Sequence, residues 1–346
     1  MNSHSYPKCI GPQDKQWLEY VKSKPQATIF HHPSWLKVLE NSYGYRPFIL
    51  VVRNIAGQIT AGLPVMEIQR PLGGKRWVSL PFTDYCSPLY DNQEAHNQLI
   101  EHLLTAYQDH HTNSIQIRWE LPSLLWIHSH TSHYLHTLPL RADSQAVLKG
   151  FKRTHRQNIS TAEERGVVIK WGTEPEHLRL FYTMQLETRH RKGVPVQPWK
   201  FFELLGKEIL DQGLGFILLA YKDSQCLAGG LFLYFQHTLT YKYAASIGEE
   251  QQLRPNNLLS WVAMQWGCDH GYTVFDLGRT ELDNDGLRRF KCGWGASETP
   301  LPYSTISTSI ASESHGKLVP IMQRMIRNAP PWFCRITGEL LYRYFG

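Results

Sequence analysis

The feature that most constrains the fold of this chain is an internal repeat. The segment FILVVRNIAGQITAGLPV begins at Phe48, and the similar segment FILLAYKDSQCLAGGLFL begins at Phe216. With one residue of difference in loop length, the Ala-Gly pair at 61–62 aligns with the pair at 228–229. Each segment consists of an apolar run, a polar turn and a second apolar run, which is the pattern of a β-hairpin. The repeat therefore predicts two halves of related fold.

The segments around the two hairpins follow the same order. Before each hairpin, apolar residues recur at helical spacing, in residues 32–45 of the first half and residues 176–190 and 198–213 of the second. After each hairpin come a strand, a helix and a further strand, at residues 76–82, 94–110 and 114–120 in the first half and at 238–247, 256–271 and 272–278 in the second.

We therefore expect an α/β protein in which helices cover mixed sheets. Two related domains are predicted, at residues 1–140 and 141–310, with a cleft between or beside them as the default ligand site. Residues 311–346 are expected to form a basic amphipathic tail, because apolar residues are interspersed there with arginines. Two positions are open to such a tail: the anionic inner leaflet of a membrane, or the body of this or another chain.

Composition narrows the class of protein. Hydrophobic residues make up 42% of the 346 residues, as in a globular protein. No apolar run approaches the ~20 residues that a membrane span needs, and the N-terminus lacks the apolar region of a signal peptide. The six cysteines form no CxxC pair, which favours reduced thiols in the cytoplasm. No metal site is expected at His128, His130, His133 and His136, whose spacing is irregular and which no carboxylate or cysteine joins.

The net charge is +6, and its distribution is more informative than its size. Lys149, Lys152, Arg153 and Arg156 lie close together with no acid among them. A second basic group spans residues 189–192, and the third is the tail. Such groups favour phosphates, nucleic acid or lipid headgroups as partners, and a solvated helix face is an equally good reading of each one alone.

Six segments carry a resemblance to a known family. They are LPFTDYCSPLYD at 80–91, FKRTHRQNISTAEERG at 151–166, TRHRKGVPVQPWKFF at 188–202, YKYAAS at 241–246, RPNNLLSW at 254–261 and DLGRTELDNDGLRRFKCGWGA at 276–296. Over residues 30–303 the chain resembles the FemAB family of tandem GNAT-fold aminoacyl and acyl transferases. The sequences of these segments are similar to those of the FemAB-like proteins that accompany exosortase and polysaccharide systems in Gram-negative bacteria.

The resemblance implies an amide-forming reaction in which an amine attacks an activated acyl carbon. Such a reaction needs a neutral amine, a polarised carbonyl and a charge partner for the leaving group. In the family a carboxylate contacts the acceptor amine. The match is Asp84 or Asp91, and Asp84 is preferred because it follows a predicted strand directly; an Asx-turn or a helix cap is the alternative for both.

Lys291 matches the family's lysine in a GL-x-x-FK-x-G context. The resemblance implies that this lysine holds a phosphate of the donor or stabilises the oxyanion of the intermediate. A structural lysine that extends from the edge of the sheet is the alternative.

Further substrate-binding residues are expected in the second half. The resemblance implies that Arg153 and Arg156 grip phosphates. Arg189 and Lys192 are candidates for lining the same cleft. Arg279, directly after a predicted strand, is a further candidate, and a structural pair with Glu281 or Asp276 is the alternative. Tyr241 and Tyr243 alternate along a strand, so both are expected on one side of it, where Tyr243 is a candidate for the site and core packing is the alternative.

The donor is expected to be aminoacyl-tRNA, with acyl-CoA less favoured and no cofactor tightly bound. GNAT enzymes that use acetyl-CoA receive its pyrophosphate on glycine-rich backbone at a helix start, where this chain has Pro255, Asn256 and Asn257. Asn257 is expected to bind substrate.

The acceptor is an amine-bearing envelope or polysaccharide precursor, and DNA is not an expected partner. Two other functions remain open: an acyl-CoA or acyl-carrier-protein dependent N-acyltransferase, and a non-catalytic basic scaffold. The expected location is the cytoplasm, with peripheral contact at the inner membrane.

Overall fold

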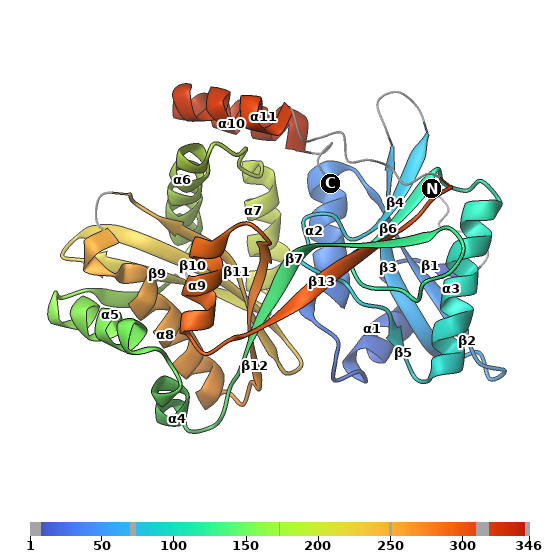
Figure 1. Cartoon of the computed structure of the whole chain (residues 1–346), viewed down its shortest axis with the longest axis horizontal. Helices are drawn as coiled ribbons and strands as arrows, with labels where there is room; N and C mark the ends of the chain where they lie inside the picture. Colours follow the sequence, from blue (N-terminus) through green and yellow to red (C-terminus); the bar gives the residue numbers. More distant parts are fainter. Residues whose placement is uncertain (1–7, 70–73, 173, 249–250, 309–317, 343–346) are drawn as a thin grey trace. The chain divides into compact units, whose positions relative to one another are not determined.

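The computed structural model describes residues 8–69, 74–172, 174–248, 251–308 and 318–342. The chain divides into two compact units (Figure 1). Unit 1 comprises Met1–His133, Pro300–Ser314 and Arg343–Gly346, and unit 2 comprises Tyr134–Thr299 and His315–Tyr342. Strands β7 (Ile127–Pro139) and β13 (Ser297–Ile306) carry the chain from one unit to the other.

Unit 1 is built on a mixed sheet. The hairpin β2 (Arg46–Arg53) and β3 (Ile59–Gln69) is antiparallel, and β4 (Lys75–Ser79) continues the antiparallel order beside β3. Helix α3 (Gln93–Gln108) then leads to β6 (Ser114–Ile117), which is parallel to β4. The strand order is β1-β2-β3-β4-β6-β13. The other elements are β1 (Cys9–Ile10), α1 (Lys15–Lys22), a 3-10 turn (Ile29–His31), α2 (Pro33–Tyr43) and β5 (Leu89–Tyr90), which pairs with β3.

Unit 2 repeats this plan. The hairpin β9 (Gly215–Lys222) and β10 (Gln225–Phe235) is antiparallel, as is β11 (Thr238–Ser246) beside β10. Helix α8 (Pro255–Asp269) leads to β12 (Val274–Glu281), which is parallel to β11. The strand order is β7-β12-β11-β10-β9-β8. The other elements are α4 (Ser144–Lys149), α5 (Arg153–Glu164), β8 (Val168–Gly172), α6 (Pro175–Lys192), α7 (Trp199–Leu205) with a π-helical turn (Gly206–Leu210), a 3-10 turn (Gln251–Leu253), α9 (Asp285–Gly293), α10 (Leu318–Asn328) and α11 (Pro331–Leu341).

The two units therefore share one sequence of pairings: hairpin, antiparallel third strand, helix, parallel fourth strand. This confirms the predicted α/β class and the predicted order of elements. A strand that joins its neighbour in parallel needs a crossover, and α3 and α8 supply it.

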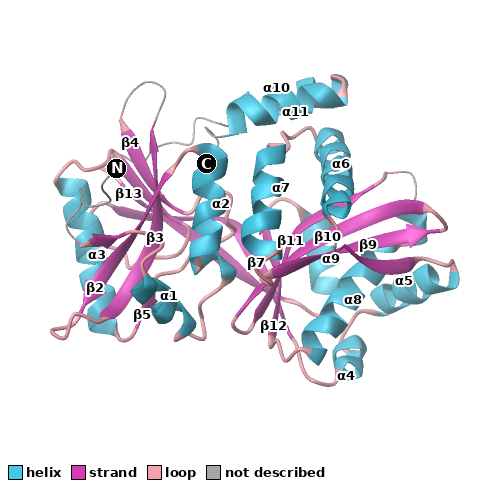
Figure 2. Cartoon of the chain, turned by 180° about the vertical axis from the view of Figure 1, so that it is seen from behind, coloured by secondary structure: helices cyan, strands magenta, loops and turns pink. Residues whose placement is uncertain are grey.

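Helices cover both faces of each sheet. In unit 1, α2 and α3 lie on opposite sides, and in unit 2, α6 and α7 lie opposite α5 and α8 (Figures 1 and 2). Neighbouring glycines of β10 mark the two faces of unit 2. A Cβ on Gly229 would meet Phe181 of α6, and a Cβ on Gly230 would meet Leu259 of α8.

The glycines of the sequence repeat allow a helix to approach the hairpin closely. A Cβ on Gly62 would lie 2.5 Å from the ring of Trp17 in α1, and one on Gly229 would lie 2.8 Å from the ring of Phe181. Both aromatic rings are fully buried. The repeated Ala-Gly pair is thus a packing device used in both units, because neither position leaves room for a side chain.

Strand β11 departs from regular geometry at Lys242. Leu231 of β10 pairs with Tyr243, whereas the next residue, Phe232, pairs with Tyr241, so Lys242 is the extra residue of a β-bulge. The prediction that Tyr241 and Tyr243 share one side of the strand is therefore wrong. Tyr241 stacks on Phe232 on the side covered by α8, and Tyr243 packs against α7.

The C-terminal segment is helical where it is described. Cys334 of α11 is fully buried and its thiol donates to Val194 O, and His190 of α6 lies 2.6 Å from Ala329 O. A Cβ on Gly338 would collide with Val196 O, so α11 packs directly on backbone. Residues 311–317 and 343–346 of the predicted tail lie outside the described residues. Among the helices of the described ranges, none has both the length and the apolar character required to cross a membrane.

We expect Gly62→Ala and Gly229→Ala each to lower the free energy of unfolding by about 1–3 kcal/mol, the usual effect of overpacking a core. Chemical denaturation of the purified variants measures this. The control is Gly286→Ala, where the nearest atom to the added Cβ is 4.0 Å away, and no loss is expected there. Equal stability of all three variants would contradict the packing role of the repeat.

Candidate functional site

The loop that carries Asp84 in unit 1 has a strained backbone. Leu80 and Phe82 have positive φ values of 143° and 58°. Such conformations cost bulky residues about 1–3 kcal/mol each and persist where neighbours enforce them. Here Arg118 donates to Thr83 O, and the hydroxyl of Tyr303 donates to the backbone oxygen of Asp84. The half-buried Asp84 therefore sits on a loop that its surroundings hold firmly.

Asp91, the alternative carboxylate, has a different environment. Its Oδ1 lies 2.6 Å from Lys24 Nζ and accepts a hydrogen bond of 2.9 Å from the hydroxyl of Tyr20. Both partners belong to the α1 region, so Asp91 ties that helix to the end of β5. These contacts give Asp91 a structural role and leave Asp84 as the better candidate of the two.

Lys291 is buried in unit 2 with only 6% of its surface exposed. Its ammonium donates hydrogen bonds of 3.0 Å to Gly278 O and 3.0 Å to Arg279 O. These carbonyls come from consecutive residues of β12, and the positive φ of Gly278, 72°, is a conformation that glycine adopts without strain. Lys291 thus fastens α9 to β12. Its predicted role toward the donor stays a prediction.

A second group of charged residues lies beside Lys291. Arg288 of α9 forms two hydrogen bonds with Glu298, of 3.0 Å from Nε and 2.8 Å from Nη2. His136 of β7 places Nε2 3.0 Å from the same carboxylate. Because an ionised carboxylate only accepts hydrogen bonds, the proton of the imidazole resides on Nε2.

The pKa values of this group follow from these contacts. The hydrogen bonds from Arg288 lower the pKa of Glu298 from its usual 4.5 to about 2, with a further contribution from His136. Burial lowers the pKa of His136, and the nearby charge of Lys291 lowers it further. The resulting state is an ionised Glu298 between a guanidinium and a neutral imidazole.

His136, Cys292 and Glu298 also have the spacing of metal ligands, because their ligand atoms lie within 4.8 Å of one another. Arg288 occupies both oxygens of Glu298, however, so a divalent cation would have to displace an ion pair. This argues against a metal at this position.

The residues predicted around α5 have mainly structural contacts. Arg156 donates to Phe151 O and, at 3.2 Å, to Lys149 O, which closes the turn before α5. Arg153 is exposed on the same helix. Asn257 is 5% exposed, and its Nδ2 lies 2.8 Å from Nδ1 of the buried His155. Of these three, Arg153 alone is exposed to solvent.

The remaining predicted residues belong to other parts of unit 2. Arg189 donates to Pro195 O at 3.1 Å and to the hydroxyl of Tyr342 at 3.3 Å. The hydroxyl of Tyr243 accepts a hydrogen bond of 3.0 Å from Gln197. Arg279 is half-buried on β12, and its carbonyl binds Lys291. Among the residues predicted from the sequence, Lys291 and Arg279 are in direct contact, through the backbone carbonyl of Arg279.

Sequence reasoning missed the residues that surround the two catalytic candidates, Asp84 in unit 1 and Lys291 in unit 2. Arg118 and Tyr303 hold the Asp84 loop, with the guanidinium 5.8 Å from the centre of the tyrosine ring. Glu298 and Arg288 form the ion pair beside Lys291. The signal for Arg288 was its place next to the matched motif. The contacts of Arg118 and Tyr303 join segments that are far apart in the sequence, so no local sequence pattern could predict these contacts.

The strands β11 and β12 pair over three residues, from Thr238 with Val274 to Thr240 with Asp276. Both strands continue beyond this point, β11 to Ser246 and β12 to Glu281. In unit 1, by contrast, all of β6 pairs with β4. The parallel strands of unit 2 thus separate after Thr240 and Asp276, next to the β-bulge at Lys242. One of the two strands is β12, whose carbonyls bind Lys291.

Comparisons with known proteins agree with this geometry. Residues 149–292 match the model of an acetyltransferase (GNAT) domain. The chain is 33% identical over 75 residues to the lipid II:glycine glycyltransferase of Staphylococcus aureus, a match that covers 20% of this chain and 18% of that protein. It therefore spans about a fifth of the length of the curated relatives it matches.

Two solved structures share the fold. The crystal structure of FemX superimposes with a TM-score of 0.70 at 16% identity, covering 90% of this chain and 100% of FemX. A tandem GNAT protein from the clavulanic acid biosynthesis pathway superimposes with a TM-score of 0.53 at 11% identity, covering 88% and 98%. Together these matches confirm the predicted tandem GNAT fold and the resemblance to Fem proteins. The association with polysaccharide systems stays a prediction.

Glu298→Gln is expected to remove a pH-dependent part of the stability of unit 2. The pKa of Glu298 is about 2 in the folded chain and 4.5 without its partners, so the ionised pair stabilises the fold above pH 4.5. This contribution is lost as the pH falls from 4.5 toward 2. The free energy of unfolding of the two proteins, measured across this range, should differ most above pH 4.5 and converge below it.

The matched control is Glu187→Gln, which breaks a more exposed pair with Arg191 at 3.7 Å. Its difference from the original protein should be small and nearly independent of pH. A pH-independent difference for Glu298→Gln would contradict the proposed ionisation.

Proposed function

We propose that this chain, a FemAB-like GNAT acyltransferase, transfers an aminoacyl or acyl group to an amine of a cell-envelope or polysaccharide-related precursor. The observation that carries the proposal is the separation of β11 from β12 within a GNAT-type sheet. Main-chain groups along separating strands can bind an extended chain of amide groups, in the way that an added strand binds a sheet edge. An aminoacyl donor arm and a peptide-bearing acceptor both contain such groups.

The predicted catalytic residues take complementary parts in this proposal. Asp84 contacts the acceptor amine, which must be neutral to attack, and its held loop fixes the position of the carboxylate. Lys291 supports the donor side, either by contact with the developing negative charge or by fixing the carbonyls of Gly278 and Arg279. Arg153, Arg189 and Arg279 remain candidates for phosphate contacts on the substrates.

The start of α8 favours a donor other than acyl-CoA. Pro255, the first residue of the helix, has no N–H group, and the N–H groups of Asn257 and Leu258 both point to Arg254 O. Few donors are therefore left at the position where a pyrophosphate would sit on the helix terminus. The side chain of Asn257 is also engaged with His155. These features support aminoacyl-tRNA as the donor.

The acceptor class comes from the relatives. The name of the S. aureus relative states lipid II as its acceptor, and by analogy we propose an amine-bearing envelope precursor here. A lipid-linked acceptor would place the reaction at the inner face of the membrane. The amphipathic helices α10 and α11 are then the proposed site of peripheral membrane contact.

The first test of the reaction is a mass-spectrometric screen of donors. Charged tRNAs and acyl-CoAs are offered in parallel with amine-bearing precursors, and transfer from tRNA alone is expected. In this screen, Asp84→Asn should lower the rate by about 10²-fold or more, the usual effect of losing a positioned acid or base. The matched control is Asp91→Asn, which should lose stability through its broken contacts with Tyr20 and Lys24 and keep the rate.

Three results would change the proposal. Transfer from acyl-CoA alone would assign the chain to the CoA-dependent N-acyltransferases. Equal rates for Asp84→Asn and the original protein would remove Asp84 from the mechanism. Absence of transfer from every donor, with substrate binding retained, would favour a non-catalytic scaffold.

Lys291→Met is expected to lower both the stability and the rate. Two hydrogen bonds from a buried charge are lost, and their acceptors remain, which costs about 1–3 kcal/mol. The rate is measured well below the melting temperature of the variant, so that it reports on folded protein. Lys207→Met, at an exposed position, is the control. An unchanged rate for folded Lys291→Met would overturn the role of Lys291 in the reaction.

A further inference from the structure

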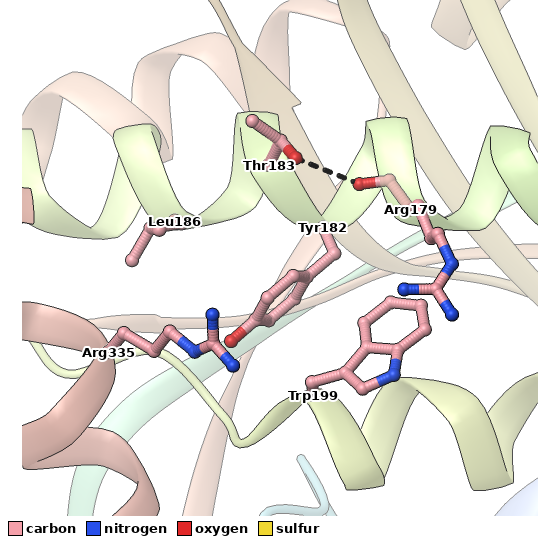
Figure 3. A pocket seen from close by; sticks show the side chains of 6 residues that line it. All are labelled: Arg179, Tyr182, Thr183, Leu186, Trp199 and Arg335. Carbon is pink, nitrogen blue, oxygen red and sulfur yellow. Dashed lines mark hydrogen bonds between the residues drawn. The ribbon is translucent and has the colours of Figure 1, made fainter. Parts of the chain in front are cut away.

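A pocket of about 320 Å³ lies among α6, α7 and α11, outside the site described above. Its lining residues are Arg179, Tyr182, Thr183, Leu186, Trp199 and Arg335 (Figure 3). The lining contains two guanidinium groups and, among these residues, no acid. Glu339, beside the lining, pairs with Arg335, so one positive charge remains, and the pocket has the charge and the size of a small site for an anionic ligand.

The hydroxyl of Tyr182 is a buried polar group with a missing partner. The residue is 8% exposed, and within the described part of the chain its hydroxyl has no hydrogen-bond partner. Figure 3 shows this hydroxyl directed toward the guanidinium of Arg335. Burial raises the pKa of Tyr182 to about 12, so the hydroxyl remains protonated and able to donate. An unsatisfied buried hydroxyl is costly, and a bound acceptor would satisfy it.

The two arginines are held in place at the rim. The guanidinium of Arg179 lies 4.8 Å from the centre of the Trp199 ring, in a cation–π contact. Arg335 uses Nε to bind Glu339 at 2.8 Å, an i,i+4 pair along α11. Both side chains are exposed to solvent, so an incoming anion can reach them.

We propose that this pocket binds a phosphate group. A phosphate has enough acceptor oxygens for both guanidiniums and the hydroxyl of Tyr182 at once, and arginine forks match its geometry. The volume exceeds that of a phosphate ion, which leaves space beside Trp199 and Leu186 for a small organic substituent. The ligand class is therefore a phosphate ester.

The outer face of α11 indicates where such an ester comes from. Trp332 is 59% exposed and Ile336 is 43% exposed. With Arg335 they follow i, i+3, i+4 spacing and form one face, while Cys334 and Gly338 pack on the opposite side. An exposed tryptophan and isoleucine beside arginine suit the headgroup region of a membrane. A lipid headgroup is thus the favoured source, and this part of the inference rests on the proposed membrane contact.

The test uses the full chain with two probes, sn-glycerol 3-phosphate and phosphatidylcholine vesicles with or without phosphatidylglycerol. Calorimetry and vesicle co-sedimentation give the dissociation constants. Tyr182→Phe and Arg335→Gln should each weaken glycerol phosphate binding by about tenfold or more, as expected for a hydrogen bond to a charged group. Tyr182→Phe should keep the melting temperature of the original protein, because the hydroxyl it removes has no partner in the ligand-free chain.

Arg324→Gln is the matched control, since it removes one exposed positive charge from α10 without touching the pocket. It should leave glycerol phosphate binding unchanged. If vesicle binding also needs Tyr182 and phosphatidylglycerol, the source is a lipid headgroup. If only glycerol phosphate needs Tyr182, the source is a free phosphate ester.

The proposal that the pocket binds phosphate would be overturned by either of two results. One is absence of glycerol phosphate binding, and the other is equal weakening of that binding by Arg324→Gln and Tyr182→Phe. Either result is distinguishable from failure of the proposed transferase reaction. Tyr182→Phe is expected to keep the rate of transfer between soluble substrates, and Asp84→Asn is expected to keep phosphate binding.

Discussion

The buried ammonium of Lys291 is the contact on which the organisation of the unit 2 site depends. A charge with 6% exposure is tolerated only where hydrogen bonds replace water, and the carbonyls of Gly278 and Arg279 provide them. The bond fixes α9 on β12. Because α9 also carries Arg288, it sets the position of Glu298 at the start of β13 and, through Glu298, the orientation of His136. One lysine thereby fixes the relative positions of several elements beside the separating strands.

The order of helices and strands could be predicted because each element has its own local pattern of apolar residues. Each hairpin has its own alternation of apolar runs and turn, and each crossover helix has its own periodicity. The repeat then reinforced both halves, since Ala61-Gly62 and Ala228-Gly229 occupy equivalent positions. The structure adds the reason for the glycines, which is the ring of Trp17 in one unit and of Phe181 in the other.

The side-chain environments could not be predicted, because they depend on contacts between distant segments. A single extra residue, Lys242, turned Tyr243 to the opposite side of β11 from Tyr241. A bulge has no clear signature in composition, so regular alternation was the natural expectation. Asn257 had the sequence context of a ligand-binding helix start, yet His155 from another helix takes its amide.

The two units differ at the positions where the candidate functional residues lie. Since both units have the same pairing plan, a feature found in one alone is not required by that plan. In unit 1 the parallel pair β4 and β6 stays closed, and the strain lies in the Asp84 loop that follows β4. In unit 2 the parallel pair opens after Thr240, and the GNAT domain match at residues 149–292 falls in this unit. Each unit therefore departs from the shared plan next to one of the two catalytic candidates: at the Asp84 loop in unit 1, and on β12, whose carbonyls bind Lys291, in unit 2.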